Sequence, residues 1–354
     1  MSNFKILVVA ASDDLWVTQD ALSVLESVGA VTRLDLNATA DQSERRQRFH
    51  AAISDVDAIV SAPWGTAGIP PLTPETFASA TRLKVIAGTY DNRFDGWLDV
   101  QDANARGITV IDTSRSMTPT VAEFALAMIL NLLRNIPHEL QQVRAGRWID
   151  GWFDTKGFVA GDLTGKRVGL AGYGSINRRL REFLVPFRCD VAVFDPFVSD
   201  DTLGRDDARR ASSLVELARG CDIFVVGIPP MPTTLGIISR AVIDAIPRGG
   251  LFVLVTRMAV VEQEALWRRT QAGEIRAAVD VYASEPPPID SPIRTDPNVL
   301  PTPHLAGNTA YCHRRCFRTA CEDAAAALAG RPLRYEATVR DALMYAGKWE
   351  SARA

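Results

Sequence analysis

The chain has 354 residues, of which 23% are charged and 47% hydrophobic, and its formal net charge at pH 7 is −3. This composition is typical of a folded globular protein and excludes a disordered or fibrous one, while the length favours two domains over one. Without an excess of basic residues, no nucleic-acid partner is expected.

The N-terminal sequence MSNFKILVVAA already has the pattern of a strand and lacks the order of a secretion signal, which predicts a cytoplasmic protein. The longest apolar run, Val121–Leu133, is interrupted by Glu123 and Asn131. It is shorter than the roughly 20 residues that cross a bilayer. No membrane segment is therefore expected, and the run is interpreted as a helix buried in a domain or between subunits.

Short β-branched runs alternate with helical stretches along the chain, which is the pattern of parallel sheets covered by helices. The first series of predicted strands is Ile6–Ala10, Val31–Leu36, Ala58–Ser61, Leu83–Ala87 and Ile108–Ile111. The second series is Arg167–Ala171, Val191–Asp195, Ile223–Ile228, Leu251–Thr256, Ala277–Val281 and Val299–Leu300. A long helix, Val121–Arg134, separates the two series. We therefore expect two α/β units, with ligands at the carboxyl ends of the strands.

The last predicted helix, about Ala310–Leu328, is followed by Gly330 and Pro332, a typical stop signal. It carries three of the five cysteines and one of the four histidines. No second pair of possible ligands has zinc-like spacing, so we interpret these cysteines as packing residues and predict no metal site.

The stretch GLAGYGSINR places Gly172 and Gly174 at a strand-to-helix turn, the context of a dinucleotide-binding loop. There Gly172 permits the tight turn and Gly174 lets the backbone approach a pyrophosphate at the helix N-terminus. Asn177 stands where the third glycine of G-x-G-x-x-G is expected. That glycine serves close packing of helix on strand, which a small shift of the helix can relieve, so we predict a working site.

Asp195 ends the next predicted strand, 21 residues after Gly174. This is close to the spacing of the acidic residue that binds the 2′-hydroxyl of a ribose. No arginine follows immediately, so a 2′-phosphate would be repelled. The cofactor is therefore predicted to be NAD rather than NADP.

Three residues at predicted strand ends are candidates for chemistry. His304 lies on a loop between a strand and a helix, a position that suits proton transfer near neutral pH. Arg257 follows another strand and offers a guanidinium that fits a carboxylate. Glu285 precedes three prolines. Taken singly, each of these residues is better explained as an ordinary surface side chain.

Between about residues 110 and 330 the chain resembles the D-isomer-specific 2-hydroxyacid dehydrogenases, which include D-3-phosphoglycerate, D-lactate, glyoxylate/hydroxypyruvate and formate dehydrogenases. The blocks that carry the resemblance are, in order, VAEFALAMILNLLR, RAGRW, LTGKRVGLAGYGSI, VAVFDP, IPPMPTTLGII, GGLFVLVTRMAVVEQEAL, AAVDVYASEP and LPTPHLAGNT. The first hundred residues fit this family more loosely.

The resemblance implies an NAD-dependent oxidoreductase that acts on a 2-hydroxy or 2-keto acid. It assigns the substrate carboxylate to Arg257 and acid/base catalysis to His304, with Glu285 paired to His304 to favour the imidazolium. The implied cofactor contacts are Gly172, Gly174, Ser175, Ile176, Asp195, Pro229, Thr234, Thr256 and Asp280, the last near the nicotinamide amide.

The resemblance also implies two Rossmann-like domains. A flavodoxin-like substrate domain would comprise residues 1–112 and 305–354, with an inserted NAD-binding domain at 113–304. The helix around Val121–Arg134 would help to form a homodimer.

Two further features depart from the family pattern. Met258 follows Arg257 where the family usually has glycine. The family's substrate loop commonly reads Gly-x-Gly-x-Asp, whereas here Gly88–Asp95 reads GTYDNRFD. Trp64, Asn92 and Arg93 are candidate substrate contacts, each equally compatible with loop structure or packing.

Two alternatives stay open. One is a non-catalytic NAD(H)-binding sensor, like the corepressors that resemble this family. The other is a dehydrogenase of a sugar-derived hydroxy acid, which the changed loop suggests. The presence of Arg257, Glu285 and His304 favours an enzyme, because a pure sensor needs none of them.

Overall fold

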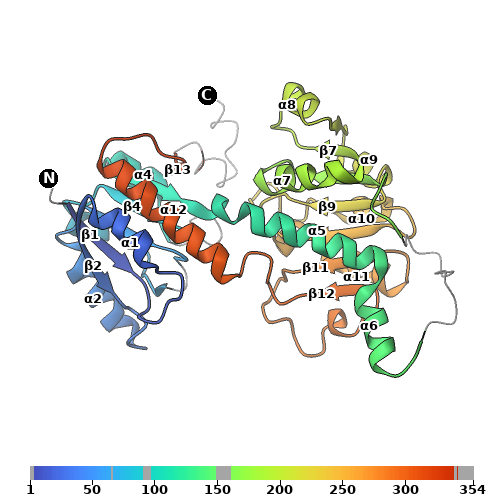
Figure 1. The fold of residues 1–354 in the computed structure, drawn as a ribbon, viewed down its shortest axis with the longest axis horizontal. Helices are drawn as coiled ribbons and strands as arrows, with labels where there is room; N and C mark the ends of the chain where they lie inside the picture. The colour runs from blue at the N-terminus through green and yellow to red at the C-terminus, as the bar shows by residue number, and fades with distance from the viewer. Residues whose placement is uncertain (1–3, 65–66, 91–96, 149–160, 339–340, 342–354) are drawn as a thin grey trace. The chain divides into compact units, whose positions relative to one another are not determined.

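The computed structural model describes the chain except for residues 1–3, 65–66, 91–96, 149–160, 339–340 and 342–354. The chain divides into two compact units (Figure 1). Unit 1 comprises Met1–Met117 and Asn308–Ala354, and unit 2 comprises Thr118–Gly307. Each contains one sheet of almost entirely parallel strands. The predicted α/β fold class with two parallel sheets is therefore confirmed.

The described part of unit 1 forms a six-stranded sheet in the order β13-β5-β4-β3-β1-β2, in which only the edge strand β13 is antiparallel. Without β13 this is the strand order of flavodoxin-like folds. The strands are β1 (Phe4–Val9), β2 (Gly29–Leu34), β3 (Ala58–Ser61), β4 (Val85–Gly88), β5 (Thr109–Asp112) and β13 (Glu336–Ala337). The helices are α1 (Gln19–Glu26), α2 (Gln42–Ile53), α3 (Pro74–Ser79), α4 (Val100–Ala105), the 3-10 helix η3 (Thr113–Met117) and α12 (Ala310–Leu328).

Helices cover both faces of the sheet of unit 1, because the strands present apolar side chains on both faces. Val8 faces a core shared with α1 and α12, and Val9 faces a core shared with α2, α3 and α4. Thr309 caps the N-terminus of helix α12, where its hydroxyl accepts the N–H of Cys312 (3.1 Å), and Gly330 at φ +66° lies just after the helix ends. The three cysteines of α12 are fully buried in this core.

The described part of unit 2 forms a seven-stranded sheet in the order β12-β11-β10-β9-β6-β7-β8. This is the order of a dinucleotide-binding Rossmann fold with one strand added at the edge. The strands are β6 (Arg167–Ala171), β7 (Asp190–Phe194), β8 (Arg209–Arg210), β9 (Ile223–Val226), β10 (Leu251–Leu254), β11 (Arg276–Val279) and β12 (Val299–Pro301). The helices are α5 (Thr118–Arg134), α6 (Ile136–Arg144), α7 (Ser175–Leu184), η4 (Val185–Phe187), α8 (Asp200–Arg205), α9 (Leu214–Arg219), α10 (Arg240–Ala245), η5 (Met258–Val260), α11 (Gln263–Gln271) and η6 (Pro292–Arg294).

In unit 2, α5 packs against α7 and against β10 and β11, while α9, α10 and α11 pack next to one another. The segment Thr113–Arg134 has 22 residues and is apolar enough to cross a membrane by length and composition alone. Helix α5 nevertheless buries Ala122, Ala125 and Ile129 completely, as core helices do.

The boundaries between the units lie slightly after the predicted positions, at Met117 rather than 112 and at Gly307 rather than 304. The first shift arises because η3 packs on α12 of unit 1. The second arises because Leu305 and Ala306 donate backbone hydrogen bonds to Asp280 of unit 2.

Candidate active site

The glycine turn joins β6 to α7. Gly172 has φ +84°, and a Cβ atom there would lie 3.0 Å from the backbone of Gly227, so both its conformation and its surroundings require glycine. Gly174 precedes α7 as its N-cap, and a Cβ atom placed on it meets nothing within 4 Å. The N-terminus of α7 is therefore uncovered on this side, as the binding of a pyrophosphate requires.

Asn177 is compatible with this turn because a glycine elsewhere makes room for it. The Asn177 side chain is buried at 1% exposure, and its Nδ2 donates to the carbonyl oxygen of Gly172 (2.7 Å). It packs against Gly227, just after β9, where a Cβ atom would lie 2.3 Å from Nδ2. The third glycine of the motif normally provides the space for close packing of the helix. Here Gly227, after β9, provides that space for the Asn177 side chain of α7.

Asp195 lies directly after β7, beside the glycine turn. Its carboxylate accepts hydrogen bonds from the backbone N–H groups of Tyr173 (2.7 Å) and Phe197 (2.8 Å) and stays partly exposed. Arg210, at the end of β8, donates to the carbonyl oxygen of Asp195 (3.1 Å) and pairs with Asp200. The carboxylate is therefore fixed by the turn, and its exposed part is available to a ribose.

The other predicted cofactor contacts of unit 2 also lie at the carboxyl ends of its strands or at the start of α7. Ser175 and Ile176 form the first turn of α7. Thr234 is 8% exposed and closes the loop after β9, because its hydroxyl lies 2.7 Å from the carbonyl oxygen of Pro229. The hydroxyl of Thr256, after β10, donates to Val226 (3.2 Å). These residues, the turn and Asp195 suit NAD, and their roles as contacts remain predictions.

His304 and Glu285 form a hydrogen-bonded pair in unit 2. His304 Nδ1 lies 2.7 Å from Glu285 Oε2, and the two side chains are 42% and 37% exposed. The backbone N–H of Tyr282 donates to the other carboxylate oxygen (2.9 Å). Among the described residues no hydrogen bond occupies His304 Nε2. This ring atom is therefore available for proton transfer.

The pKa of Glu285 is lowered below its ordinary value although partial burial acts in the opposite direction. The lowering comes from the hydrogen bonds of His304 and of the Tyr282 N–H, and from the positive charges of His304 and Arg257. Glu285 is therefore ionised at neutral pH. Arg257 therefore lies close enough to this carboxylate to affect it electrostatically, and the catalytic roles of the three residues remain predictions.

Arg257 follows β10 and is partly buried, and one of its guanidinium nitrogens donates to the carbonyl oxygen of Thr256 (2.9 Å). The next residue, Met258, is 3% exposed and packs in the core of unit 2. Met258 begins the 3-10 helix η5 and is not among the residues with a positive φ. Replacing the family's usual glycine by Met258 therefore requires no unusual conformation.

Of the candidate substrate residues, Asn92 and Arg93 lie outside the described residues. Trp64, in unit 1, is fully buried. Its ring packs on Tyr90 with ring centroids 4.9 Å apart, and a Cβ atom at Gly88 would lie 2.7 Å from the indole. Trp64 thus supports the start of the unusual loop from inside unit 1, and a contact with substrate remains a prediction.

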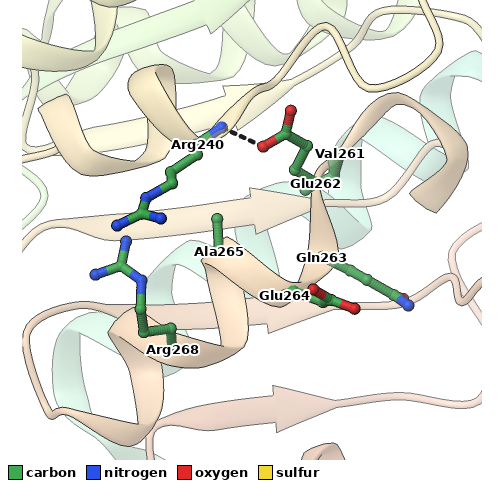
Figure 2. A pocket seen from close by; sticks show the side chains of 7 residues that line it. All are labelled: Arg240, Val261, Glu262, Gln263, Glu264, Ala265 and Arg268. Carbon is green, nitrogen blue, oxygen red and sulfur yellow. Dashed lines mark hydrogen bonds between the residues drawn. The ribbon is translucent and has the colours of Figure 1, made fainter.

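A surface hollow of unit 2, formed by α10, α11 and the residues before α11, is lined by charged side chains (Figure 2). Arg240 and Arg268 extend toward each other there, but both pair with Asp244. Glu262 accepts the backbone N–H of Arg240 (2.7 Å). Because the two arginines are already paired and none of the predicted site residues lines the hollow, we assign no ligand to it.

Comparison with known proteins identifies the family. Residues 126–306 match the model of the D-isomer specific 2-hydroxyacid dehydrogenase NAD binding domain. The chain is 31% identical to D-3-phosphoglycerate dehydrogenase of Haemophilus influenzae over 304 residues, which cover 83% of this chain and 68% of that protein. It is 29% identical to the enzyme of the same name from Methanocaldococcus jannaschii over 82% of this chain, but spans only 52% of that relative.

Solved structures extend the likeness over almost the whole chain. The holo form of D-mandelate dehydrogenase from Rhodotorula graminis superposes with a TM-score of 0.79 at 24% identity, over 95% of this chain and 98% of that one. An NADPH-dependent glyoxylate/hydroxypyruvate reductase from Sinorhizobium meliloti reaches 0.73 at 25% identity, over 95% and 98%. The chain therefore belongs to the D-isomer specific 2-hydroxyacid dehydrogenase family, and unit 2 contains its NAD-binding domain.

Proposed function

We propose that the chain is an NAD-dependent dehydrogenase that interconverts a D-2-hydroxy acid and the corresponding 2-keto acid. The observation that carries this proposal is the 2.7 Å contact between His304 and Glu285, with Arg257 acting on the same carboxylate. These groups lie in the unit that carries the glycine turn. A protein that only senses NAD(H) has no use for a paired acid/base, so catalysis is the better explanation.

In the reductive direction, NADH would, when bound, provide the hydride for reduction of the keto acid at C2. His304 donates its Nε2 proton to the carbonyl oxygen, which becomes the hydroxyl group. Glu285, ionised and bonded to Nδ1, orients the imidazole so that Nε2 is presented for this transfer. Arg257 binds the substrate carboxylate through two N–H groups. In the oxidative direction neutral His304 accepts the hydroxyl proton.

The test is NADH oxidation with a panel of 2-keto acids: glyoxylate, hydroxypyruvate, pyruvate, longer aliphatic acids and sugar-derived acids. We expect turnover of at least one, and a loss of at least about 100-fold in kcat for His304→Ala. His50→Ala, a histidine of α2 in unit 1, is the matched control and is expected to keep full activity. Binding of NADH without turnover of any keto acid would favour the sensor, and full activity of His304→Ala would refute the proton-transfer role.

We further propose a cytoplasmic homodimer. The helix predicted to form the dimer contact, α5, buries much of its apolar surface within unit 2, so we propose the contact on the next helix, α6, which has no buried residue. Ile136, Leu140 and Val143 lie on one face of α6 and are 48%, 46% and 52% exposed. A second copy of the chain is the partner expected to cover this face, and light scattering of the purified protein measures the oligomeric state.

A further inference from the structure

The side chain of Asp280 organises the loop that carries His304. Asp280 follows β11, and its side chain is fully buried. One carboxylate oxygen accepts the hydroxyl of Thr302 (2.7 Å) and the backbone N–H of Leu305 (2.8 Å), and the other accepts the N–H of Ala306 (2.9 Å). The backbone carbonyl of Asp280 accepts the N–H of His304 itself (2.9 Å). Asp280 therefore fixes the chain both before and after His304.

This carboxylate is unusual because it is buried without a countercharge. Among the described residues no arginine, lysine or histidine forms an ion pair with it, so its charge is balanced only by hydrogen-bond donors. Burying a carboxylate is costly unless such donors satisfy it. All three donors come from residues 302–306, so the loop and the charge stabilise each other.

His304 needs this support because its backbone is in a rarely occupied conformation. Its φ is +53°, in the left-handed region that non-glycine residues adopt only when their surroundings enforce it. The bonds from Leu305 and Ala306 fix the chain immediately after His304, and the bond from Thr302 fixes it before. The imidazole consequently leaves the loop in the direction that reaches Glu285.

We propose that Asp280 is a positioning residue that sets the His304 imidazole for proton transfer by holding residues 302–306. This rests on the proposed function and deepens it. It differs from the role that the family resemblance implies, a contact with the nicotinamide amide, because it acts through His304 and does not require bound cofactor.

The first test reads the position of His304 without any activity. In protein labelled with ¹⁵N-histidine, the Nδ1 proton that bonds to Glu285 gives a low-field NMR signal that is assigned by its loss in His304→Gln. We expect Asp280→Asn to shift or remove this signal, because an amide NH₂ cannot accept both sets of loop donors. An unchanged signal in folded Asp280→Asn would overturn the proposal. This outcome does not depend on finding a substrate, so it is distinct from failure of the proposed function.

The second test separates positioning from cofactor binding. Because a displacement of about 1 Å in a catalytic group can cost about 100-fold, we expect kcat of Asp280→Asn to fall by about 10- to 100-fold while the Kd for NADH changes by less than about threefold. In the His304→Ala background the same substitution is expected to add less than about a threefold loss, since the group that it positions is already absent. If the kcat losses of Asp280→Asn and His304→Ala instead multiply in the double variant, and Asp280→Asn raises the Kd for NADH tenfold or more, Asp280 acts on the cofactor and the proposal is overturned.

A milder variant covers the case in which Asp280→Asn does not fold. Thr302→Val removes one donor to the carboxylate and keeps the shape of the side chain. It is expected to shift the same NMR signal and to lower kcat by a smaller factor. Thr295→Val, in an exposed turn after η6, is the matched control and is expected to change neither. If Thr302→Val and Thr295→Val have the same NMR signal from His304 and the same kcat, the proposal is overturned.

Discussion

Because Asn177 packs directly on Gly227, adding a single methyl group at position 227 is expected to reduce both the stability of the protein and its affinity for NADH. In Gly227→Ala the new Cβ would lie 2.3 Å from Asn177 Nδ2 and 2.7 Å from its Cγ, far inside contact distance. Gly227 does not need a left-handed backbone, so alanine is acceptable there on conformational grounds. The methyl group must therefore displace the Asn177 side chain and break its hydrogen bond to Gly172.

The magnitude follows from these two consequences. Overpacking a close-packed interior costs about 1–3 kcal/mol, and losing the hydrogen bond costs about 0.5–1.5 kcal/mol. The free energy of unfolding is expected to fall by about 2–4 kcal/mol, which lowers the Tm of a unit of this size by about 4–16 °C. Because Gly172 belongs to the glycine turn, the Kd for NADH is expected to rise at least about tenfold.

Thermal unfolding and fluorescence titration with NADH measure both effects. Gly204→Ala is the control, because nothing lies within 4 Å of a Cβ at that position in α8. It is expected to leave NADH binding unchanged and to stabilise slightly. Adding Asn177→Gly to Gly227→Ala removes the clash and is expected to recover part of the affinity. If Gly227→Ala melts and binds NADH like the wild type, the packing argument is wrong.

Two other predictions concern charge. Asp195→Ala is expected to raise the Kd for NADH at least about tenfold. It is also expected to weaken discrimination against NADPH, because the carboxylate fixed by Tyr173 and Phe197 is no longer present to repel a 2′-phosphate. Titrations with both cofactors test this, and an unchanged preference for NADH contradicts it. Because the pKa of Glu285 is lowered in the folded protein, its ionised form stabilises the folded state at pH values above the ordinary pKa of a glutamate. This contribution is lost as the pH falls through the pKa of Glu285 in the folded state. Denaturant unfolding should therefore show wild type more stable than Glu285→Gln at pH 7, with the difference vanishing in acid, and a difference that grows toward acid would refute the sign.

The strands and helices that fill the two cores were predictable because their patterns are strong. The predicted β3 and β6 agree with the observed bounds, as does α12, whose end is marked by Gly330. The predictions missed β8 and β13, which have two residues each and pair only at the edges of their sheets. Such short edge strands depend on a neighbouring strand and leave no periodic pattern in the sequence.

The individual catalytic candidates were recognisable from the sequence, but the contacts that support them were not. Asn177 and Gly227 are separated by 50 positions, and nothing local to either residue indicates that the two pack together. Arg210 reaches the carbonyl oxygen of Asp195 from a strand that has no sequence signal. The bonds from the His304 loop to Asp280 likewise depend on the register of β11 against β12. These are tertiary relationships, which a reading of local pattern does not contain.

The most direct measurement of the central claim uses NADH in which both hydrogens at C4 of the nicotinamide are replaced by deuterium, together with the best keto acid of the panel. Mass spectrometry of the product is expected to find one deuterium on C2 of a D-2-hydroxy acid, formed by the wild type and at least about 100-fold more slowly by His304→Ala. A product without deuterium at C2, or equal rates for the two proteins, would contradict the account.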